Sequence, residues 1–301
     1  TVVKIFVVTG GRGFIGSHFV ERALKEGHQV IDIDKMTYAA NRKLPWDNHK
    51  RYELIESDIK DITHLPTCDY VINFAAESHV DNSINSSTIF VESNIVGVHN
   101  LLEIIRGKVY SKPLFFQIST DEVYGDIREE SFSEDALLSP SNPYSASKAS
   151  AEMIVIAYAR TYGIPYVITR SSNNYGPRQY QEKLISQSIL CVENNRKIPV
   201  HGDGSYVRDW IYVKDNVDAI FTIIDKNIKN EIFNIGANNS LTNLEVVKSV
   251  MSWFGETQLD QNVEFVENRM GQDLRYSIDF KKIKKLGWTP KYSSGLYNFL
   301  R

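Results

Sequence analysis

Two periodicities of apolar residues alternate along the first 170 residues of the chain. The segment VVKIFVVTG (Val2–Gly10) is a run of β-branched and aromatic residues, which predicts a buried strand. The segment FIGSHFVERALKEG (Phe14–Gly27) has apolar residues at helical spacing and ends in glycine, which predicts a helix. A second apolar run, HQVIDID (His28–Asp34), completes a predicted strand–helix–strand unit.

The same alternation continues as far as Arg170. Strands that are apolar on both faces are typical of a parallel sheet that helices cover on both sides. The pattern therefore predicts an α/β fold with a doubly wound parallel sheet. The further elements expected are strands at Tyr52–Asp58, Tyr70–Ala76, Pro113–Ser119 and Pro165–Arg170, and helices at Ile95–Arg106 and Tyr144–Tyr162.

After Ser171 the regular alternation of predicted strands and helices ends, which predicts a smaller second lobe. Thr242 and Glu245 have the spacing of a capping box at the start of a helix that closes at Gly255. A short strand is expected at Val263–Glu267 and a short helix at Asp279–Trp288. We expect a cofactor-binding domain at residues 1–172, with a returning segment near 210–238, and a substrate-binding lobe formed mainly by residues 173–301.

Composition excludes a few classes of protein. The 301 residues are 42% hydrophobic and carry a formal charge of -3, which indicates a globular protein that does not bind nucleic acid. Cys68 and Cys191 lack metal-ligand spacing and are expected to be buried thiols in a reducing compartment, with no metal bound. We recognise no basic and apolar leader sequence in the chain, and no apolar run approaches the ~18 residues of a membrane span. We therefore expect a cytoplasmic protein without a membrane partner.

The first motif with chemistry is GGRGFIG, which follows the first predicted strand and leads into the first predicted helix. Glycines at Gly10, Gly13 and Gly16 would let the backbone turn sharply and bring the helix N-terminus close to a diphosphate. The next strand ends in Asp34, where an acid binds the ribose hydroxyls of NAD and repels the 2′-phosphate of NADP. The motif therefore predicts a Rossmann-type NAD site, although Asp34 could simply terminate its strand.

A second motif, NPYSASKASAE, places Tyr144 and Lys148 four residues apart on one helical face. There an ammonium would stabilise tyrosinate and lower the pKa of the phenol towards neutrality. A Tyr–Lys pair is more often a half-buried aromatic beside a solvated charge. Together with the glycine motif and Thr120, the pair instead predicts a hydride-transfer site.

Two adjacent acids, Asp121 and Glu122, follow the expected strand Pro113–Ser119. Adjacent carboxylates at a strand end are usually a solvated turn, because ionised acids avoid burial. In one cleft, two carboxyls that share a charge separate their pKa values, so that one can donate a proton and the other accept one. Both interpretations are open at this point.

With these motifs the sequence resembles the extended short-chain dehydrogenase/reductase superfamily and, within it, the dTDP-glucose 4,6-dehydratases. The similarity runs almost from end to end, through blocks that include TGGRGFIGSH, STDEVYGD and PYSASKASAE. The resemblance implies a bound NAD, a nucleotide-sugar substrate and a homodimer paired through the two long helices. It further implies that Thr120 binds substrate, Asp121 is the acid, Glu122 the base, Tyr144 the redox base and Lys148 its electrostatic partner.

The resemblance also implies two sets of binding residues. Besides the three glycines, Tyr144 and Lys148, the implied cofactor contacts are Phe14, Ile15, Asp34, Lys35, Thr37, Asp58, Ile59, Ala75, Ala76, Ser78 and Asn174. The implied nucleotide-sugar contacts are Ser83, Thr120, Asn173, Lys183, Leu184, Arg208, Asn243, Arg269 and Gln272.

The chain departs from the family pattern in two places. It has NRMGQ (Asn268–Gln272) where the family usually has Asp-Arg-Pro-Gly-His, and His201 where Tyr is frequent. Because Arg269 is retained, we expect diphosphate binding to be retained. His201 could stack on the base of a dTDP ligand or be a plain surface residue.

The activity implied by the resemblance is dehydration of dTDP-glucose in deoxysugar biosynthesis. Oxidation at C4 acidifies C5, water leaves across C5 and C6, and hydride returns to C6. UDP-glucose stays open as the substrate, and related epimerases and decarboxylases stay open as activities, but these enzymes commonly lack an acid where Asp121 stands. A non-catalytic NAD-sensing protein is the alternative from a different class, and the five retained catalytic positions argue against it.

Overall fold

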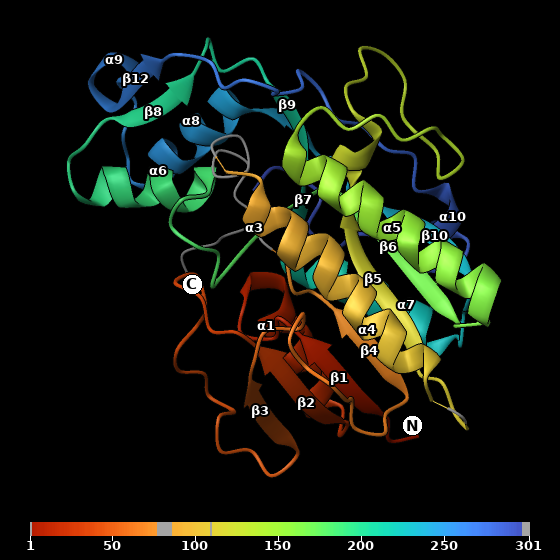
Figure 1. Ribbon diagram of the computed structural model, residues 1–301. Helices are drawn as coiled ribbons and strands as arrows, with labels where there is room; N and C mark the ends of the chain where they lie inside the picture. The colour runs from red at the N-terminus through yellow and green to blue at the C-terminus, as the bar shows by residue number, and fades with distance from the viewer. Residues whose placement is uncertain (1, 77–85, 109, 297–301) are drawn as a thin grey trace.

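The computed structural model describes residues 2–76, 86–108 and 110–296, and a seven-stranded sheet runs through its larger lobe (Figure 1). The strand order is β10-β6-β5-β4-β1-β2-β3, and every neighbouring pair is parallel. This confirms the predicted doubly wound sheet. The strands are β1 (Ile5–Thr9), β2 (Gln29–Asp34), β3 (Tyr52–Glu56), β4 (Tyr70–Asn73), β5 (Leu114–Thr120), β6 (Tyr166–Ser171) and β10 (Glu231–Ile235).

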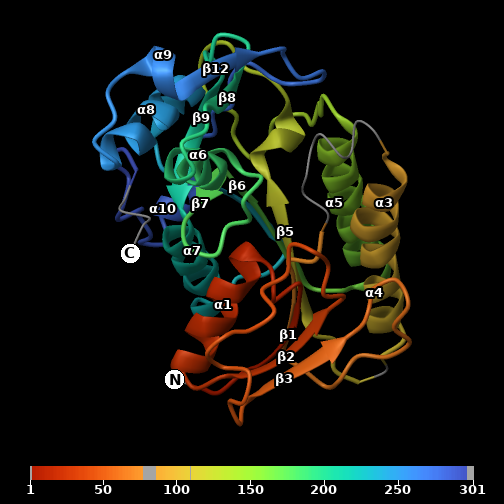
Figure 2. The ribbon, with the colours of Figure 1, turned by 90° about the vertical axis from the view of Figure 1, so that its left-hand side faces the viewer.

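Helices cover both faces of this sheet (Figure 2). On one face α1 (Phe14–Lys25) packs against α7 (Val213–Asp225), and on the other α4 (Gly97–Arg106) packs against α5 (Pro143–Tyr162). The longest of them, α5, begins where the Asn142 side chain accepts a hydrogen bond from the amide of Ser145, and it ends at Gly163 in the left-handed conformation. The core is therefore split into two apolar layers, one on each side of the sheet.

The helix before β5 is longer than predicted, because α3 (Thr88–Val91) and the π-helical turn η1 (Glu92–Val96) run directly into α4. The continuous stretch Thr88–Arg106 has 19 residues and a mean hydropathy of 1.2, which meets the length and composition of a membrane span. The expectation that no segment reaches that length was wrong. Its apolar character has a local cause, since Val98, Leu101 and Ile105 are fully buried in the core layer on that side of the sheet.

The second lobe is built from small sheets and short helices. Its helix α8 (Asn243–Trp253) begins with the predicted capping box of Thr242 and Glu245. The predicted helix at Asp279–Trp288 shrinks to one turn, α10 (Lys281–Lys284), because Gly287 turns the chain at a φ of 92°. The remaining elements are β7 (Asn173–Tyr175), α6 (Leu184–Glu193), β8 (Ile198–His201), β9 (Val207–Tyr212), β11 (Ser240–Thr242), α9 (Leu259–Asn262) and β12 (Val263–Val266).

The chain passes repeatedly between the two lobes. It leaves the large sheet after Ser171, returns at Val213 to form α7 and β10, and leaves again after Ile235. A buried carboxylate holds a later segment against α7, since Asp215 accepts hydrogen bonds from the amides of Lys291 and Tyr292 at 3.0 and 2.9 Å. The carboxyl ends of the parallel strands thus face the second lobe, which is where doubly wound folds bind ligands.

Candidate active site

The glycine-rich loop between β1 and α1 forms one wall of a cavity. Gly10 has a φ of 76°, and a Cβ there would lie 2.7 Å from the amide nitrogen of Ala75. A Cβ on Gly16 would lie 2.2 Å from the carbonyl oxygen of Gly10, so a side chain is excluded at both positions. Gly13 is the N-cap of α1, whose first turn consists of uncharged residues. The amides and positive dipole end of α1 are therefore available to an anionic ligand such as a diphosphate.

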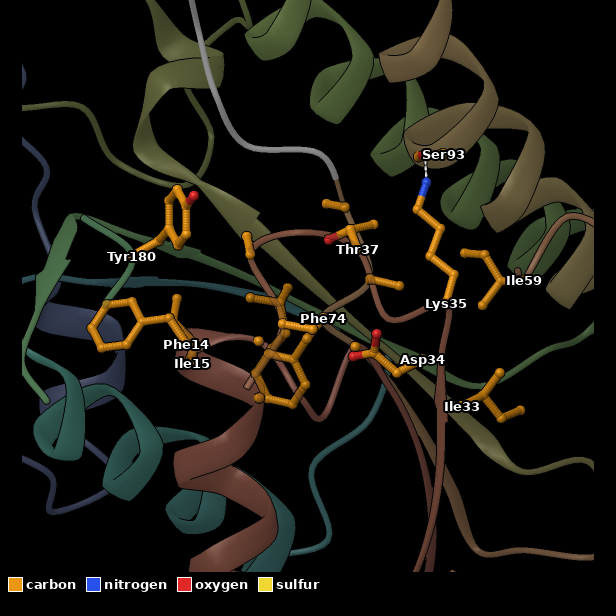
Figure 3. Close-up of a pocket in the computed structure, with 18 of the residues that line it drawn as sticks. Phe14, Ile15, Ile33, Asp34, Lys35, Thr37, Ile59, Phe74, Ser93 and Tyr180 are labelled. Atoms are coloured by element: carbon orange, nitrogen blue, oxygen red, sulfur yellow. Dashed lines mark hydrogen bonds between the residues drawn. The ribbon is translucent and has the colours of Figure 1, made fainter. Parts of the chain in front are cut away.

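Asp34 ends β2 inside the same cavity, beside Thr37 (Figure 3). Its carboxylate accepts hydrogen bonds from the amides of Arg12 at 3.0 Å and Met36 at 2.8 Å. The neighbouring Lys35 points away from it, with Nζ 3.3 Å from Oγ of Ser93 (Figure 3). An acid fixed in this way can accept hydrogen bonds from ribose hydroxyls and repels a 2′-phosphate.

Asp32 supports the loop from behind, a role that the sequence did not reveal. It accepts hydrogen bonds from the amide of Gly11 at 2.9 Å and the hydroxyl of Tyr52 at 2.6 Å. Burial raises the pKa of this carboxyl to about 7. The neighbouring Arg12 is also buried and pairs with Asp47, so its guanidinium turns away from the cavity. Asp32 and Arg12 therefore shape the loop without facing a ligand.

A cavity of about 260 Å³ joins this loop to Tyr144 and Lys148 on helix α5. All but two of the predicted cofactor residues line it. Ser78 lies outside the described residues, and Asn174 lines a second cavity described below. Lining residues that the sequence did not single out include Ser57, Ser93, Arg178, Gln179 and Tyr180. The residues brought together there are Gly10, Gly13, Phe14, Ile15, Gly16, Asp34, Lys35, Thr37, Asp58, Ile59, Ala75, Ala76, Tyr144 and Lys148.

A second cavity, of about 320 Å³, extends into the smaller lobe. Of the predicted substrate residues only Ser83 cannot be placed, because it lies outside the described residues. The two cavities share lining residues, among them Tyr144 and Lys183, so they are halves of one cleft. The predicted residues that line the second half are Thr120, Glu122, Tyr144, Asn173, Asn174, Lys183, Leu184, His201, Arg208, Asn243, Arg269 and Gln272.

Tyr144 and Lys148 lie one turn apart on α5, as their spacing predicted. The Lys148 ammonium donates a hydrogen bond to the carbonyl oxygen of Ile118 at 2.7 Å, and burial lowers its pKa to about 8. The expected lowering of the Tyr144 pKa was wrong. Burial raises it, and the charges of Glu122 and Asp121 raise it further. The phenol is thus protonated at neutral pH.

The two adjacent acids follow β5 on a short 3₁₀ turn, η2 (Asp121–Tyr124), rather than on a solvated turn. The hydroxyl of Thr120 caps it by accepting a hydrogen bond from the amide of Glu122 at 3.2 Å. Asp121 is only 2% exposed and is absent from the described lining of both cavities, whereas Glu122 lines the second. Burial raises the pKa of both carboxyls, well above the ordinary value for Asp121.

The charges around the two acids act on them unequally. Arg208 opposes the rise of both pKa values and Lys183 opposes that of Glu122, while Glu122 itself and Asp209 raise the pKa of Asp121 and Asp273 raises that of Glu122. Asp121 is therefore the group that holds a proton, and Glu122 is the group closer to ionisation. Tyr276, which the sequence did not single out, also lines this cavity and packs against the Arg208 guanidinium at 4.2 Å from ring centroid to Cζ.

His201 belongs to a hydrogen-bonded group at the outer end of the second cavity. Its Nδ1 lies 2.9 Å from the carbonyl oxygen of Glu267, and its Nε2 accepts a hydrogen bond from Nε of Arg269 at 3.1 Å. His201 is therefore a half-exposed residue held by two hydrogen bonds at the rim of the cavity. Within the part of the chain that the structure describes, no cluster of three or more His, Cys, Asp or Glu side chains could hold a metal ion.

Comparison with known proteins agrees with this geometry. The family model described as GDP-mannose 4,6-dehydratase matches residues 7–295. The chain is 44% identical to the low-salt glycan biosynthesis protein Agl12 of Haloferax volcanii, over 95% of this chain and 94% of that protein. It is 40% identical to a dTDP-glucose 4,6-dehydratase of Neisseria meningitidis, over 98% and 91%. The dTDP-glucose 4,6-dehydratase DesIV of Streptomyces venezuelae, solved with NAD bound, superposes with a TM-score of 0.91 at 38% identity, over 95% and 92%.

Proposed function

The chain belongs to the GDP-mannose 4,6-dehydratase family, and we propose that it is an NAD-dependent lyase that converts dTDP-glucose to dTDP-4-keto-6-deoxyglucose. One observation carries this proposal. Tyr144 lines both halves of the cleft, so a sugar in the second half and a dinucleotide in the first would meet at its hydroxyl. The resemblance to dTDP-glucose 4,6-dehydratases, which the motifs predicted, is confirmed by the relatives.

The residues of the first half fit NAD. Gly10 and Gly16 leave room where a Cβ would collide with backbone, and Asp34 meets the adenosine ribose. NAD, when bound, supplies the hydride acceptor and donor and the positive charge of its nicotinamide ring. That charge favours ionisation of Tyr144, which removes the proton of the C4 hydroxyl. Lys148 holds the tyrosinate in place by electrostatic attraction.

The acid pair performs the elimination. Once C4 is a ketone, Glu122 removes the acidified C5 proton, and Asp121 donates its proton to the departing C6 hydroxyl. The hydride taken from C4 then returns to C6, and protonated Glu122 gives its proton back to C5. The stronger rise of the Asp121 pKa supports this division, since Arg208 and Lys183 both favour ionised Glu122. Asp121 is buried in this structure, so its proton would reach the hydroxyl only after a small opening of η2 or through Thr120, whose Oγ1 lies 3.4 Å from Oδ1 of Asp121.

The two lobes divide the work. We assign NAD binding to residues 1–172 with the return near 210–238, and nucleotide-sugar binding mainly to residues 173–301. In the smaller lobe Lys183, Arg208 and Arg269 line the cavity, and they would meet the diphosphate of the sugar nucleotide. This local basic charge suits an anionic substrate in a chain whose formal charge is -3.

A homodimer is the expected assembly, in the cytoplasm. The outer faces of α3, η1 and α5 expose large apolar side chains, including Ile89, Val91, Val96 and Met153. These elements lie side by side on one face of the molecule (Figure 2). Apolar residues gathered in this way favour burial by a second copy of the same helices.

Turnover in the presence of equal dTDP-glucose and UDP-glucose tests the proposal. Mass spectrometry should find a dTDP-sugar product lighter by one water, with NAD unchanged in total amount. A product of unchanged mass that chromatography separates from its substrate would indicate an epimerase, and loss of carbon dioxide from UDP-glucuronate in a parallel reaction would indicate a decarboxylase. Either result would overturn the dehydratase assignment, and preference for UDP-glucose would correct its substrate.

A further inference from the structure

A buried carboxylate lies behind the proposed redox pair. Tyr144, Lys148 and Glu152 follow one another at intervals of four residues, so they share one face of α5. Glu152 is fully buried. It is absent from the described lining of both cavities and has no part in the steps proposed above. An ionised group in such a place is costly unless partners compensate for the lost water.

The partners of Glu152 come from two neighbouring strands. Its Oε1 accepts hydrogen bonds from Nε and Nη2 of Arg170 at 2.9 and 2.6 Å, and its Oε2 accepts one from Oγ of Ser119 at 2.5 Å. Ser119 on β5 and Arg170 on β6 are paired in the sheet register, so both side chains point to the same face. Tyr124 steadies the guanidinium further by accepting a hydrogen bond from Nη1 of Arg170 at 2.8 Å.

This arrangement connects the two halves of the proposed chemistry. Ser119 directly precedes Thr120 and the acid pair, while Lys148 stands one helical turn before Glu152. We propose that Glu152 is a positioning residue for the reaction: its buried negative charge keeps Lys148 in the ammonium form, and its bonds to Ser119 and Arg170 hold α5 against the end of β5. The inference rests on the proposed function, which gives Lys148 its role.

The electrostatic part of the proposal has a clear direction. Burial lowers the pKa of Lys148 to about 8, and the Glu152 carboxylate opposes that shift. The other ionisable groups on elements packed against α5 are Tyr166 and Arg170 on β6, Asp121, Glu122 and Tyr124 on η2, Glu92 on η1, and His99, Glu103 and Arg106 on α4. The helices α3 and η1 also carry the uncharged Phe90, Ser93 and Asn94. Removing the Glu152 charge leaves the burial penalty and an uncompensated Arg170, so Lys148 should lose its proton at lower pH.

Three variants separate charge from shape. Glu152→Gln removes the charge, Glu152→Asp keeps it on a shorter side chain, and Glu152→Gln with Arg170→Gln removes both charges so that no buried ion is left unpaired. Asp215→Asn is the control, because it also weakens a buried carboxylate anchor but one on α7, outside the cleft. Circular dichroism and thermal unfolding would establish that each variant is folded before titration.

Two measurements report the protonation of Lys148. Competitive acetylation with acetic anhydride across a pH series, read by peptide mass spectrometry at matched NAD content, needs no turnover. Stopped-flow formation of reduced NAD with dTDP-glucose gives the pH profile of the oxidation step. Glu152→Gln should shift the titration of Lys148 and the alkaline limb of the profile downward by about 1 pH unit or more, and the double variant, which also loses the positive charge of Arg170, should shift both by less. Glu152→Asp and Asp215→Asn should stay close to the parent.

The outcomes are distinct. A Lys148 titration in folded Glu152→Gln that matches the parent, or an equal shift in the Asp and Gln variants, would overturn the proposal. If the parent dehydrates neither dTDP-glucose nor UDP-glucose, the proposed function fails, yet acetylation still decides whether Glu152 controls the protonation of Lys148.

Discussion

Arg269 donates its Nε hydrogen to Nε2 of His201, while Nδ1 of the same ring lies 2.9 Å from the carbonyl oxygen of Glu267. Only the neutral imidazole with its hydrogen on Nδ1 satisfies both contacts. His201 thus links Arg269 to the backbone at the place where relatives often have Tyr. The histidine therefore holds the arginine that we propose meets the diphosphate of the substrate.

Replacing this ring therefore should affect binding more than chemistry. His201→Phe keeps an aromatic ring but loses both hydrogen bonds, so we expect KM for the nucleotide sugar to rise about tenfold with little change in kcat. Steady-state kinetics would measure both constants. His64→Phe, a change at an exposed histidine, is the matched control. An unchanged KM in the His201 variant would indicate that Arg269 needs no such support.

The acid pair can be separated from the redox step. Asp121→Asn should leave the oxidation at C4 largely intact but slow elimination by ~10²-fold or more, because the departing hydroxyl loses its proton donor. Reduced NAD should then accumulate in stopped-flow absorbance. Turnover at the parental rate would show that Asp121 is not the acid.

Glu122→Gln should stall at the same stage for a different reason. Without the base, the C5 hydrogen cannot exchange with deuterated solvent, whereas Asp121→Asn should retain that exchange. Mass spectrometry of recovered nucleotide sugar reports the difference. Tyr144→Phe is the third member of the series, and with no base for the C4 hydroxyl it should leave NAD oxidised.

The glycine loop predicts a selective loss of cofactor. A Cβ on Gly16 would lie 2.2 Å from the carbonyl oxygen of Gly10, so Gly16→Ala must displace the loop. We expect NAD binding to weaken at least tenfold, since a shift of about 1 Å in a binding site can cost ~10²-fold. Isothermal titration with NAD and NADP would measure it. Gly107→Ala, whose Cβ would meet its nearest atom at an ordinary 3.5 Å, should bind NAD like the parent. The parent should bind NADP more weakly than NAD.

Acid should destabilise the protein through His18. Burial lowers its pKa to about 4, while its Nε2 contacts the carbonyl oxygen of Pro177 at 2.7 Å. In the unfolded chain the His18 ring binds a proton near pH 6.5, whereas in the folded protein it stays neutral down to about pH 4. The free energy of unfolding therefore falls as the pH falls from about 6.5 to 4, by roughly 3 kcal/mol over the whole range. In urea unfolding over this range, His18→Gln should lose less stability than the parent. Equal slopes in both proteins would contradict the assignment.

The apolar outer face predicts a charge-sensitive dimer. Val91 is 45% exposed on α3, and Val91→Glu would place a charge at the proposed contact. We expect a dimer for the parent and a monomer for this variant at micromolar concentration, measured by light scattering. Val2→Glu changes an exposed apolar residue elsewhere and should stay dimeric. A monomeric parent would remove the basis for the interface.

Patterns confined to one or two neighbouring elements could be predicted from the sequence. The glycine loop and the pairing of Tyr144 with Lys148 depend on a turn and on helical periodicity, which short spacings reveal. Asp34 could be assigned to the cavity because it ends its strand. Asp32 stands on the same face only two residues earlier, yet it is covered by Gly11 and Tyr52, and no local pattern distinguishes the two acids.

Contacts set by the sheet register could not be predicted. Glu152 meets Ser119 and Arg170 because β5 and β6 are neighbours with a particular alignment, which spacing along the chain does not encode. The burial of Asp121 likewise depends on the 3₁₀ turn after β5 and on the surroundings of that turn. The raised pKa of Tyr144 follows from the same burial.

The repeated passage of the chain between lobes also constrains its synthesis. Until Glu231–Ile235 has emerged from the ribosome, β6 remains an unpaired sheet edge, and α1 lacks the Phe221 ring that stacks on Phe19 at 4.8 Å. A fragment that ends at residue 172 would keep every glycine of the cofactor loop, yet it would expose this edge of β6 and leave the Phe19 side of α1 uncovered.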